Sequence, residues 1–86
     1  RELMGRHPAV ARFRASLAET LSALGGTHLA ARDTDKAEEA AREALTLRQR
    51  LADDQPGVPA NRIALADSHF RLGDIHRRRG EAEKAE

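Results

Sequence analysis

Along the first third of this chain, apolar residues recur among polar ones with the period of an α-helix. From about Ala9 to Ala31 the apolar residues recur at spacings of three and four, which is typical of one stripe of an amphipathic helix. We expect this stripe to face inward. Its members are Val10, Phe13, Leu17, Leu21, Leu24 and His28.

A second helix is expected from about Thr34 to Asp53. The segment 32–35 contains side-chain oxygens, on its aspartates and threonine, that can accept the free backbone N–H groups of a new helix. Glu38 and Arg42 are spaced as an i,i+4 ion pair on the solvent side. The inward side is built from alanine and leucine: Ala37, Ala40, Ala41, Ala44, Leu45, Leu47 and Leu51.

Residues 55–59 contain two prolines and a glycine, which end the second helix. A third helix is expected from about Pro59 to Arg79, and a fourth is expected to begin after a turn at Gly80. Alanine, leucine, arginine and glutamate dominate and favour helix, whereas β-branched residues are few. The pattern therefore predicts an all-α fold. The apolar positions of the third helix are Ile63, Leu65, Phe70, Leu72 and Ile75.

The chain also repeats itself. Residues 8–38 align with residues 56–86 without a gap at a constant offset of 48, and eleven of the thirty-one aligned positions are identical. Self-similarity at a fixed period indicates stacked structural repeats. We therefore expect one domain over residues 1–86. In it, residues 1–8 end a preceding helix, 9–55 form repeat one, and 56–86 form a truncated repeat two of a longer array.

Composition excludes several classes of partner. The net charge is +1, so no overall field draws the chain to nucleic acid or to anionic lipid. No apolar run approaches the roughly 20 residues that span a bilayer. The chain has no cysteine, which excludes disulfides and fits a reducing compartment, so we expect a cytoplasmic protein without nucleic-acid or membrane partners.

The sequence offers little chemistry for catalysis or cofactor binding. His28 and His76 occupy equivalent positions of the repeat, and packing between helices explains them better than a zinc site, which needs three or four convergent ligands. Ser22 and Ser68 have no nucleophile elbow around them, and no glycine-rich loop could hold phosphate. We expect no enzymatic activity, no metal and no cofactor.

These residues resemble the tetratricopeptide repeat, in particular a long-period type seen in large bacterial proteins. The resemblance rests on Leu-Gly pairs in the first helix of each unit and on small residues in the second. Three features depart from the family: His28 and His76 at the aromatic site, Arg32 at the turn glycine, and a period of 48 instead of 34. The residues that the resemblance assigns to repeat packing are Leu21, Leu24, Gly25, His28, Ala37, Ala41, Ala44, Leu72, Gly73 and His76.

The resemblance implies a right-handed α-solenoid whose concave face, lined by the first helix of each unit, binds a peptide or protein segment. The residues carried over to that face are Glu19, Ser22, Gly26, Leu29, Asp67, Phe70, Asp74, Arg77 and Arg78. The alternative is a structural spacer or an element that associates with copies of itself through exposed repeat faces. A regulatory region beside a kinase or transcription-factor domain is a further reading that rests on family analogy alone.

Overall fold

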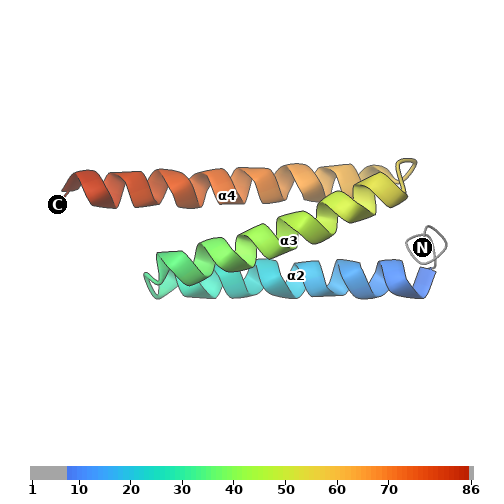
Figure 1. Cartoon of the computed structure of the whole chain (residues 1–86), viewed down its shortest axis with the longest axis horizontal. Coiled ribbons are helices and arrows are strands. Elements are labelled where there is room, and N and C mark those ends of the chain that lie inside the picture. The colour runs from blue at the N-terminus through green and yellow to red at the C-terminus, as the bar shows by residue number, and fades with distance from the viewer. Residues whose placement is uncertain (1–7, 86) are drawn as a thin grey trace.

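The computed structural model describes residues 8–85, which form three α-helices packed against one another (Figure 1). These are α2 (Pro8–Ala30), α3 (Thr34–Asp54) and α4 (Pro59–Ala85). Within the described range there is no strand, so the predicted all-α class is confirmed. The predicted end of a preceding helix at residues 1–7 lies outside the described residues.

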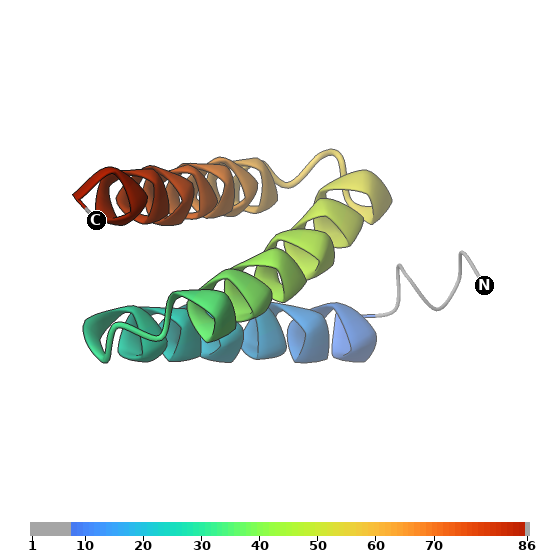
Figure 2. The ribbon, with the colours of Figure 1, turned by 60° about the vertical axis from the view of Figure 1, so that its left-hand side comes forward.

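Successive helices run antiparallel to each other. α2 and α4 point in the same direction, and α3 returns obliquely between them (Figures 1 and 2). α3 packs against both of the other helices, so it is the central element of the described chain. None of the three helices has an apolar stretch that could cross a membrane.

The first turn is closed by a Schellman motif with arginine in the position where glycine is usual. Arg32 has a φ of 65°, its N–H donates to the carbonyl of Leu29, and the N–H of Asp33 donates to the carbonyl of His28. Asp33 then caps α3, because its carboxylate accepts the N–H of Lys36 at 3.3 Å. The capping role predicted for residues 32–35 is therefore confirmed at Asp33.

The second turn is held by short-range hydrogen bonds around Pro56 and Gly57. The N–H of Gln55 donates to Leu51 at 2.9 Å, and the N–H of Val58 donates to the Gln55 carbonyl at 3.1 Å. Pro59 occupies the first turn of α4, where its missing N–H costs nothing. The break that the prolines predict is confirmed.

α2 and α3 approach each other through small residues. The buried positions of α2 are Ala11, Ala18 and Gly25, spaced seven residues apart. A methyl group at Gly25 would lie 3.4 Å from the carbonyl oxygen of Ala37 and 3.7 Å from the Cβ of Ala40, so Gly25 does mark a close approach of two backbones. The buried residues of α3 are Ala37, Ala40, Ala41, Ala44 and Leu51.

None of the six residues in the apolar stripe expected to face inward on α2 is buried, and three of them are exposed. Phe13 is 67% exposed and Leu24 is 45% exposed, although Leu21 and His28 are half-buried. The small residues beside the stripe take the contact with α3, because they let the helix axes come closer than leucine and phenylalanine would. Leu24 is therefore not part of the α2–α3 contact, and the repeat-packing role that the resemblance assigns to it stays a prediction.

α4 meets α3 with a different side from the one that α2 uses. Ile75 is buried against Ala37 and Ala41, and Leu72 packs on the same cluster. Gly73, the repeat equivalent of Gly25, is exposed, and a methyl group there would meet no atom within 4 Å. Gly73 therefore does not contact α3 as Gly25 does, and the repeat-packing role that the resemblance assigns to it stays a prediction.

α4 also continues through Gly80, where a turn was expected. A glycine inside a helix costs only about 1 kcal/mol relative to alanine, and the ion pair of Arg77 with Glu81 spans this position at 3.3 Å. The expected fourth helix does not begin within the described residues.

The two repeat-equivalent glycines should respond oppositely to the same substitution. Gly25→Leu should lower the free energy of unfolding by about 2–3 kcal/mol, because the side chain must enter the contact with α3. Gly73→Leu should raise it by roughly 0.5–1 kcal/mol, because leucine favours helix and meets open space. Urea titrations followed by circular dichroism measure both; equal effects would contradict the packing described above.

Candidate functional site

A hollow opens between α2 and α4, with α3 as its floor. Its volume is about 110 Å³. Gly25 and Gly26 line the α2 wall, and a methyl group at Gly26 would meet no atom within 4 Å, so the absence of a side chain there keeps the space open. The lining residues are Ser22, Gly25, Gly26 and Leu29 from α2, Ala41 from α3, and Ser68, Phe70, Arg71, Asp74 and Ile75 from α4.

The hollow combines an apolar centre with polar residues around it. Phe70 is 75% exposed, and Leu29, Ala41 and Ile75 supply further apolar surface. Asp74 is fixed by two arginines of its own helix, since Arg78 Nε donates to it at 3.0 Å and Arg77 also pairs with it. The site can therefore bury an apolar side chain while polar groups at its edge orient the rest of the ligand.

A second hollow, of about 210 Å³, lies further toward the start of α2 and α4. Its floor includes Arg48 of α3, whose Nη1 donates to the Ser68 hydroxyl at 2.7 Å and lies 4.0 Å from the Asp67 carboxylate. Glu19 stands on the α2 wall and Asn61 on the α4 wall. We call the two hollows together the α2/α4 groove. The second hollow is lined by Ala15, Glu19, Arg48, Leu51, Ala60, Asn61 and Ala64.

The structure brings together five of the nine residues that the sequence assigned to the binding face. They line the first hollow: Ser22, Gly26, Leu29, Phe70 and Asp74. Glu19 lines the second hollow instead, and Asp67 pairs with Arg71 at 2.7 Å. Arg77 and Arg78 lie on the surface of α4, where both pair with Asp74.

Among the polar residues that line this groove, four were not assigned to the binding face from the sequence: Arg48, Asn61, Ser68 and Arg71. Arg71 stands four residues after Asp67, a spacing that could have identified the pair. Ser68 is buried and Arg48 reaches it from α3, so that contact joins two helices and no spacing within one helix indicates it.

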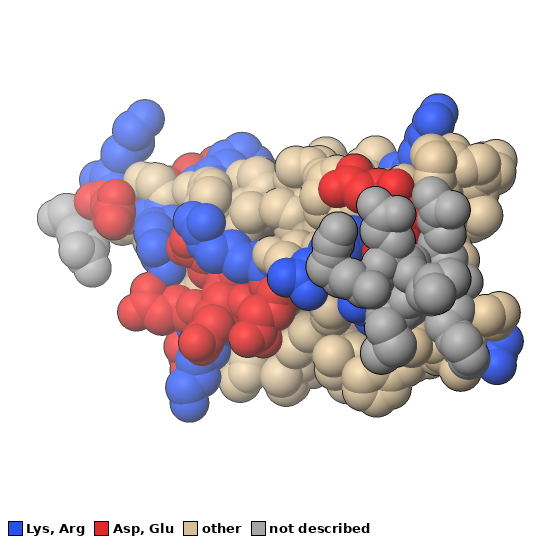
Figure 3. Space-filling model, turned by 45° about the vertical axis from the view of Figure 1, so that its right-hand side comes forward, with Lys and Arg blue, Asp and Glu red and all other residues tan. Residues whose placement is uncertain are grey.

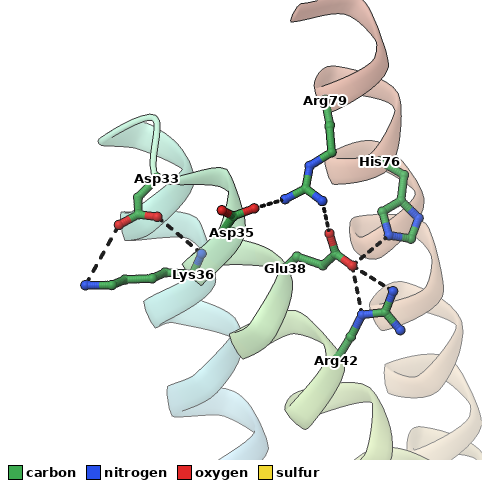
Figure 4. Close-up of polar contacts among 7 residues, drawn as sticks. All are labelled: Asp33, Asp35, Lys36, Glu38, Arg42, His76 and Arg79. Atoms are coloured by element: carbon green, nitrogen blue, oxygen red, sulfur yellow. Dashed lines mark hydrogen bonds and ion pairs between the residues drawn. The ribbon is translucent and has the colours of Figure 1, made fainter. Parts of the chain in front are cut away.

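Outside the groove, a cluster of charged side chains forms ion pairs between α4 and the start of α3 (Figure 4). Glu38 is its centre and only 15% of its side chain is exposed. One oxygen accepts from Arg42 at 2.7 and 2.9 Å and lies 3.3 Å from the Nε2 of His76. The other carboxylate oxygen of Glu38 lies 2.8 Å from the Arg79 guanidinium, in an ion pair without hydrogen-bond geometry. Arg79 also pairs with Asp35 at 2.5 Å.

The predicted Glu38–Arg42 pair is thus confirmed, but Glu38 is not on the solvent side. Its position beside α4 lets two helices share one carboxylate. Toward the left of the space-filling view, acidic side chains gather in one cluster with basic side chains beside them (Figure 3). Much of the remaining described surface in this view carries no charged side chain (Figure 3).

Charge pairing changes the acid–base behaviour of this region. The hydrogen bond from Arg42, followed by that from His76, lowers the pKa of Glu38 below its ordinary value of 4.5. On α4 the Asp74 carboxylate raises the pKa of Arg77 above its ordinary value. Among residues 8–85 no group of three or more histidine or acidic side chains is placed to hold a metal ion.

Comparison of the chain with family models, with curated proteins and with solved structures gave no match.

Acid should weaken the attachment of α4. Because the folded-state pKa of Glu38 is lowered, its contribution to the free energy of unfolding is fully present above about pH 4.5 and is lost as the pH falls through the folded pKa. Thermal unfolding measured from about pH 6 to about pH 3 should show this loss, and Glu38→Gln should flatten that part of the profile. Glu39→Gln, a change at an exposed neighbour, is the control; parallel profiles for the wild type and Glu38→Gln would refute the role of the cluster.

Proposed function

We propose that this chain is a non-catalytic protein-interaction module that binds a segment of another protein in the α2/α4 groove. The observation that carries the proposal is the open hollow between Leu29 and Phe70, which exposes apolar surface on opposite walls. Burying a phenylalanine side chain is worth about 1.5–3 kcal/mol, which is enough to anchor a segment whose other contacts are weak.

The shape of the groove favours an extended or helical segment over a compact small molecule. The two hollows follow one another along α2 and α4, so a ligand that fills both must be elongated. The polar residues of the second hollow, Glu19 and Arg48, carry opposite charges and would set the direction of the bound segment. This division of roles is typical of peptide recognition in a groove.

We also propose that the three helices belong to a tetratricopeptide-like α-solenoid in a cytoplasmic protein. Support comes from the offset of 48, from the parallel directions of the repeat-equivalent helices α2 and α4, and from the small residues at the α2–α3 contact. In such an arrangement the α2/α4 groove corresponds to the concave face.

Filling the first hollow should abolish segment binding without unfolding the chain. Gly26→Leu places a side chain in the hollow, where a methyl group would meet no atom within 4 Å. Gly73→Leu is the matched control, because Gly73 is also an exposed helical glycine but is not among the residues that line either hollow of the groove.

The probe is a display library of random dodecapeptides selected against the wild-type chain. Selected peptides should share an aliphatic or aromatic residue, and Gly26→Leu should weaken their binding at least about tenfold while Gly73→Leu leaves it unchanged. Unaltered binding to Gly26→Leu, or no enrichment over an unrelated helical protein, would count against the groove.

Self-association is a second candidate function, because α4 presents large apolar side chains to solvent. Ile63 is 70% exposed and Phe70 is 75% exposed, and they are seven residues apart on the same side of the helix. A second copy that covered both would remove two large apolar side chains from water.

Light scattering coupled to gel filtration tests this candidate over about a hundredfold range of concentration. A dimer through α4 should form as the concentration rises, and Ile63→Lys should return it to the monomer. A chain that stays monomeric throughout would remove this candidate and leave the groove proposal intact.

A further inference from the structure

The two hollows of the α2/α4 groove offer different chemistry to a bound segment. In the first hollow, Leu29 and Phe70 present apolar side chains from opposite walls. The second hollow is lined in part by alanines and has the guanidinium of Arg48 on its floor. A segment that fills both hollows must therefore match a charge as well as an apolar surface.

Arg48 brings a positive charge into this floor with little to balance it. Only 13% of its side chain is exposed. Its Nη1 donates to the neutral hydroxyl of Ser68 at 2.7 Å and lies 4.0 Å from the Asp67 carboxylate. Within residues 8–85, the Nε and Nη2 of Arg48 donate no hydrogen bond. A charge removed from water in this way is unfavourable until an ion pair and further hydrogen bonds compensate it.

Neither of the nearby carboxylates supplies that compensation. The Asp67 oxygen that faces Arg48 already accepts from the Nε of Arg71 at 2.7 Å. Glu19 lines the same hollow from the α2 wall, but it is exposed and forms no ion pair with Arg48. The Arg48 guanidinium therefore has free donors for one more carboxylate.

The other arginines at the groove are poorer anchors. Arg71 is engaged by the carboxylate described above, and Arg77 and Arg78 both pair with Asp74. Each of these three side chains is more than half exposed. Water screens such pairs, so they contribute little to binding. A carboxylate of a ligand would act most strongly on Arg48.

The two hollows are separated by seven residues along the helices that line them. On α3, Ala41 lines the first and Arg48 the second, and on α2 the corresponding residues are Gly26 and Glu19. Seven helical residues span about 10 Å. In a helical ligand, side chains seven residues apart share one face. In an extended ligand, about 10 Å is three residues, whose side chains point to opposite sides, so a helix fits the groove better.

We propose that the bound segment is a helix that carries an apolar residue and, seven residues away on the same face, a glutamate or an aspartate. This inference rests on the function proposed above. The apolar side chain enters the first hollow beside Phe70, and the carboxylate pairs with the Arg48 guanidinium in the second, where bidentate hydrogen bonds are available. Anchors two turns apart are a recurring mode by which a helix is held in a groove.

A basic residue at the same position of the ligand matches the second hollow less well. Its partner would be Glu19, which is exposed, so water would weaken the pair. It would also meet the like charge of Arg48 on the floor. Charge complementarity therefore favours an acidic ligand.

The probe is a display library in which four positions on one face of a stable helical scaffold are randomised, at i, i+3, i+7 and i+10. The library is selected against the wild-type chain. Enriched members should combine an apolar residue with an acidic residue seven positions away. Enrichment of lysine or arginine at that spacing, or of uncharged residues, would overturn the proposal.

The same selection separates failure of this inference from failure of the proposed function. Apolar enrichment without the acidic residue, in members that Gly26→Leu no longer binds, would remove the carboxylate site and leave the groove standing. No enrichment over an unrelated helical protein would count against the groove itself, and therefore against both proposals.

A double-mutant cycle locates the carboxylate. Replacing the acidic residue of an enriched member by its amide and making Arg48→Gln in the chain should each weaken binding at least about fivefold, and the two together should have little more effect than either alone. Arg50→Gln is the matched control, because Arg50 is an exposed arginine of the same helix that lines neither hollow. Additive losses, or an equal loss with Arg50→Gln, would refute the role of Arg48.

Arg48 also contacts Ser68, so circular dichroism first establishes whether Arg48→Gln folds. If it does not fold, the spacing decides the question on the wild-type chain. Moving the acidic residue of an enriched member from i+7 to i+5 turns it to the opposite side of the helix and should weaken binding at least about fivefold. Equal binding with the acidic residue at i+5 and at i+7 would contradict the proposal.

Discussion

The close contact of Gly25 with the Ala37 carbonyl is the constraint on which the rest of the structure depends. Two helices that meet through glycine and alanine have axes close together, and long side chains must then leave the contact. α3 accordingly carries alanine at most of its buried positions, and both α2 and α4 are packed against it. A core made of such small side chains contributes little burial per residue, so directional contacts between the helices carry more of the specificity.

Those directional contacts attach α4, and they define the groove. Arg48 with Ser68 holds the middle of α4, and Glu38 with Arg79 and His76 holds its far part. The wall that carries Phe70 and Asp74 is thereby placed opposite Leu29 across the alanine floor. The groove formed in this way depends on three helices at once, which explains why no single segment of the sequence encodes it.

The helices and turns could be predicted from the sequence because their signals are local. Asp33 caps α3 and Pro59 opens α4 as their residue types indicate. Gly80 was misread, because a single glycine weakens a helix by less than the neighbouring contacts stabilise it. The buried side of α2 was also misread, since the helix carries two apolar patterns and the sequence does not say which one has a neighbour in this chain.

About half of the candidate face could be predicted, since spacing from the Leu-Gly pairs correctly groups residues that share a helix side. Arg48 lies on a different helix from those pairs, and its approach to Ser68 is set by how α3 crosses α4. Glu38 was assigned to solvent because its i,i+4 spacing to Arg42 is the same whether or not another helix covers it. Contacts between helices are thus what the sequence pattern left undetermined.

Nuclear Overhauser spectra of the uniformly labelled chain test the central packing claim most directly. The account predicts cross-peaks from the Gly25 α protons to the Ala40 methyl group, and from the Ile75 methyl groups to those of Ala37 and Ala41. Cross-peaks from Gly73, instead of Gly25, to the alanines of α3 would contradict it. In that case α4 would contact α3 through the side that carries Gly73, and α2 would not contact α3 through the side that carries Gly25.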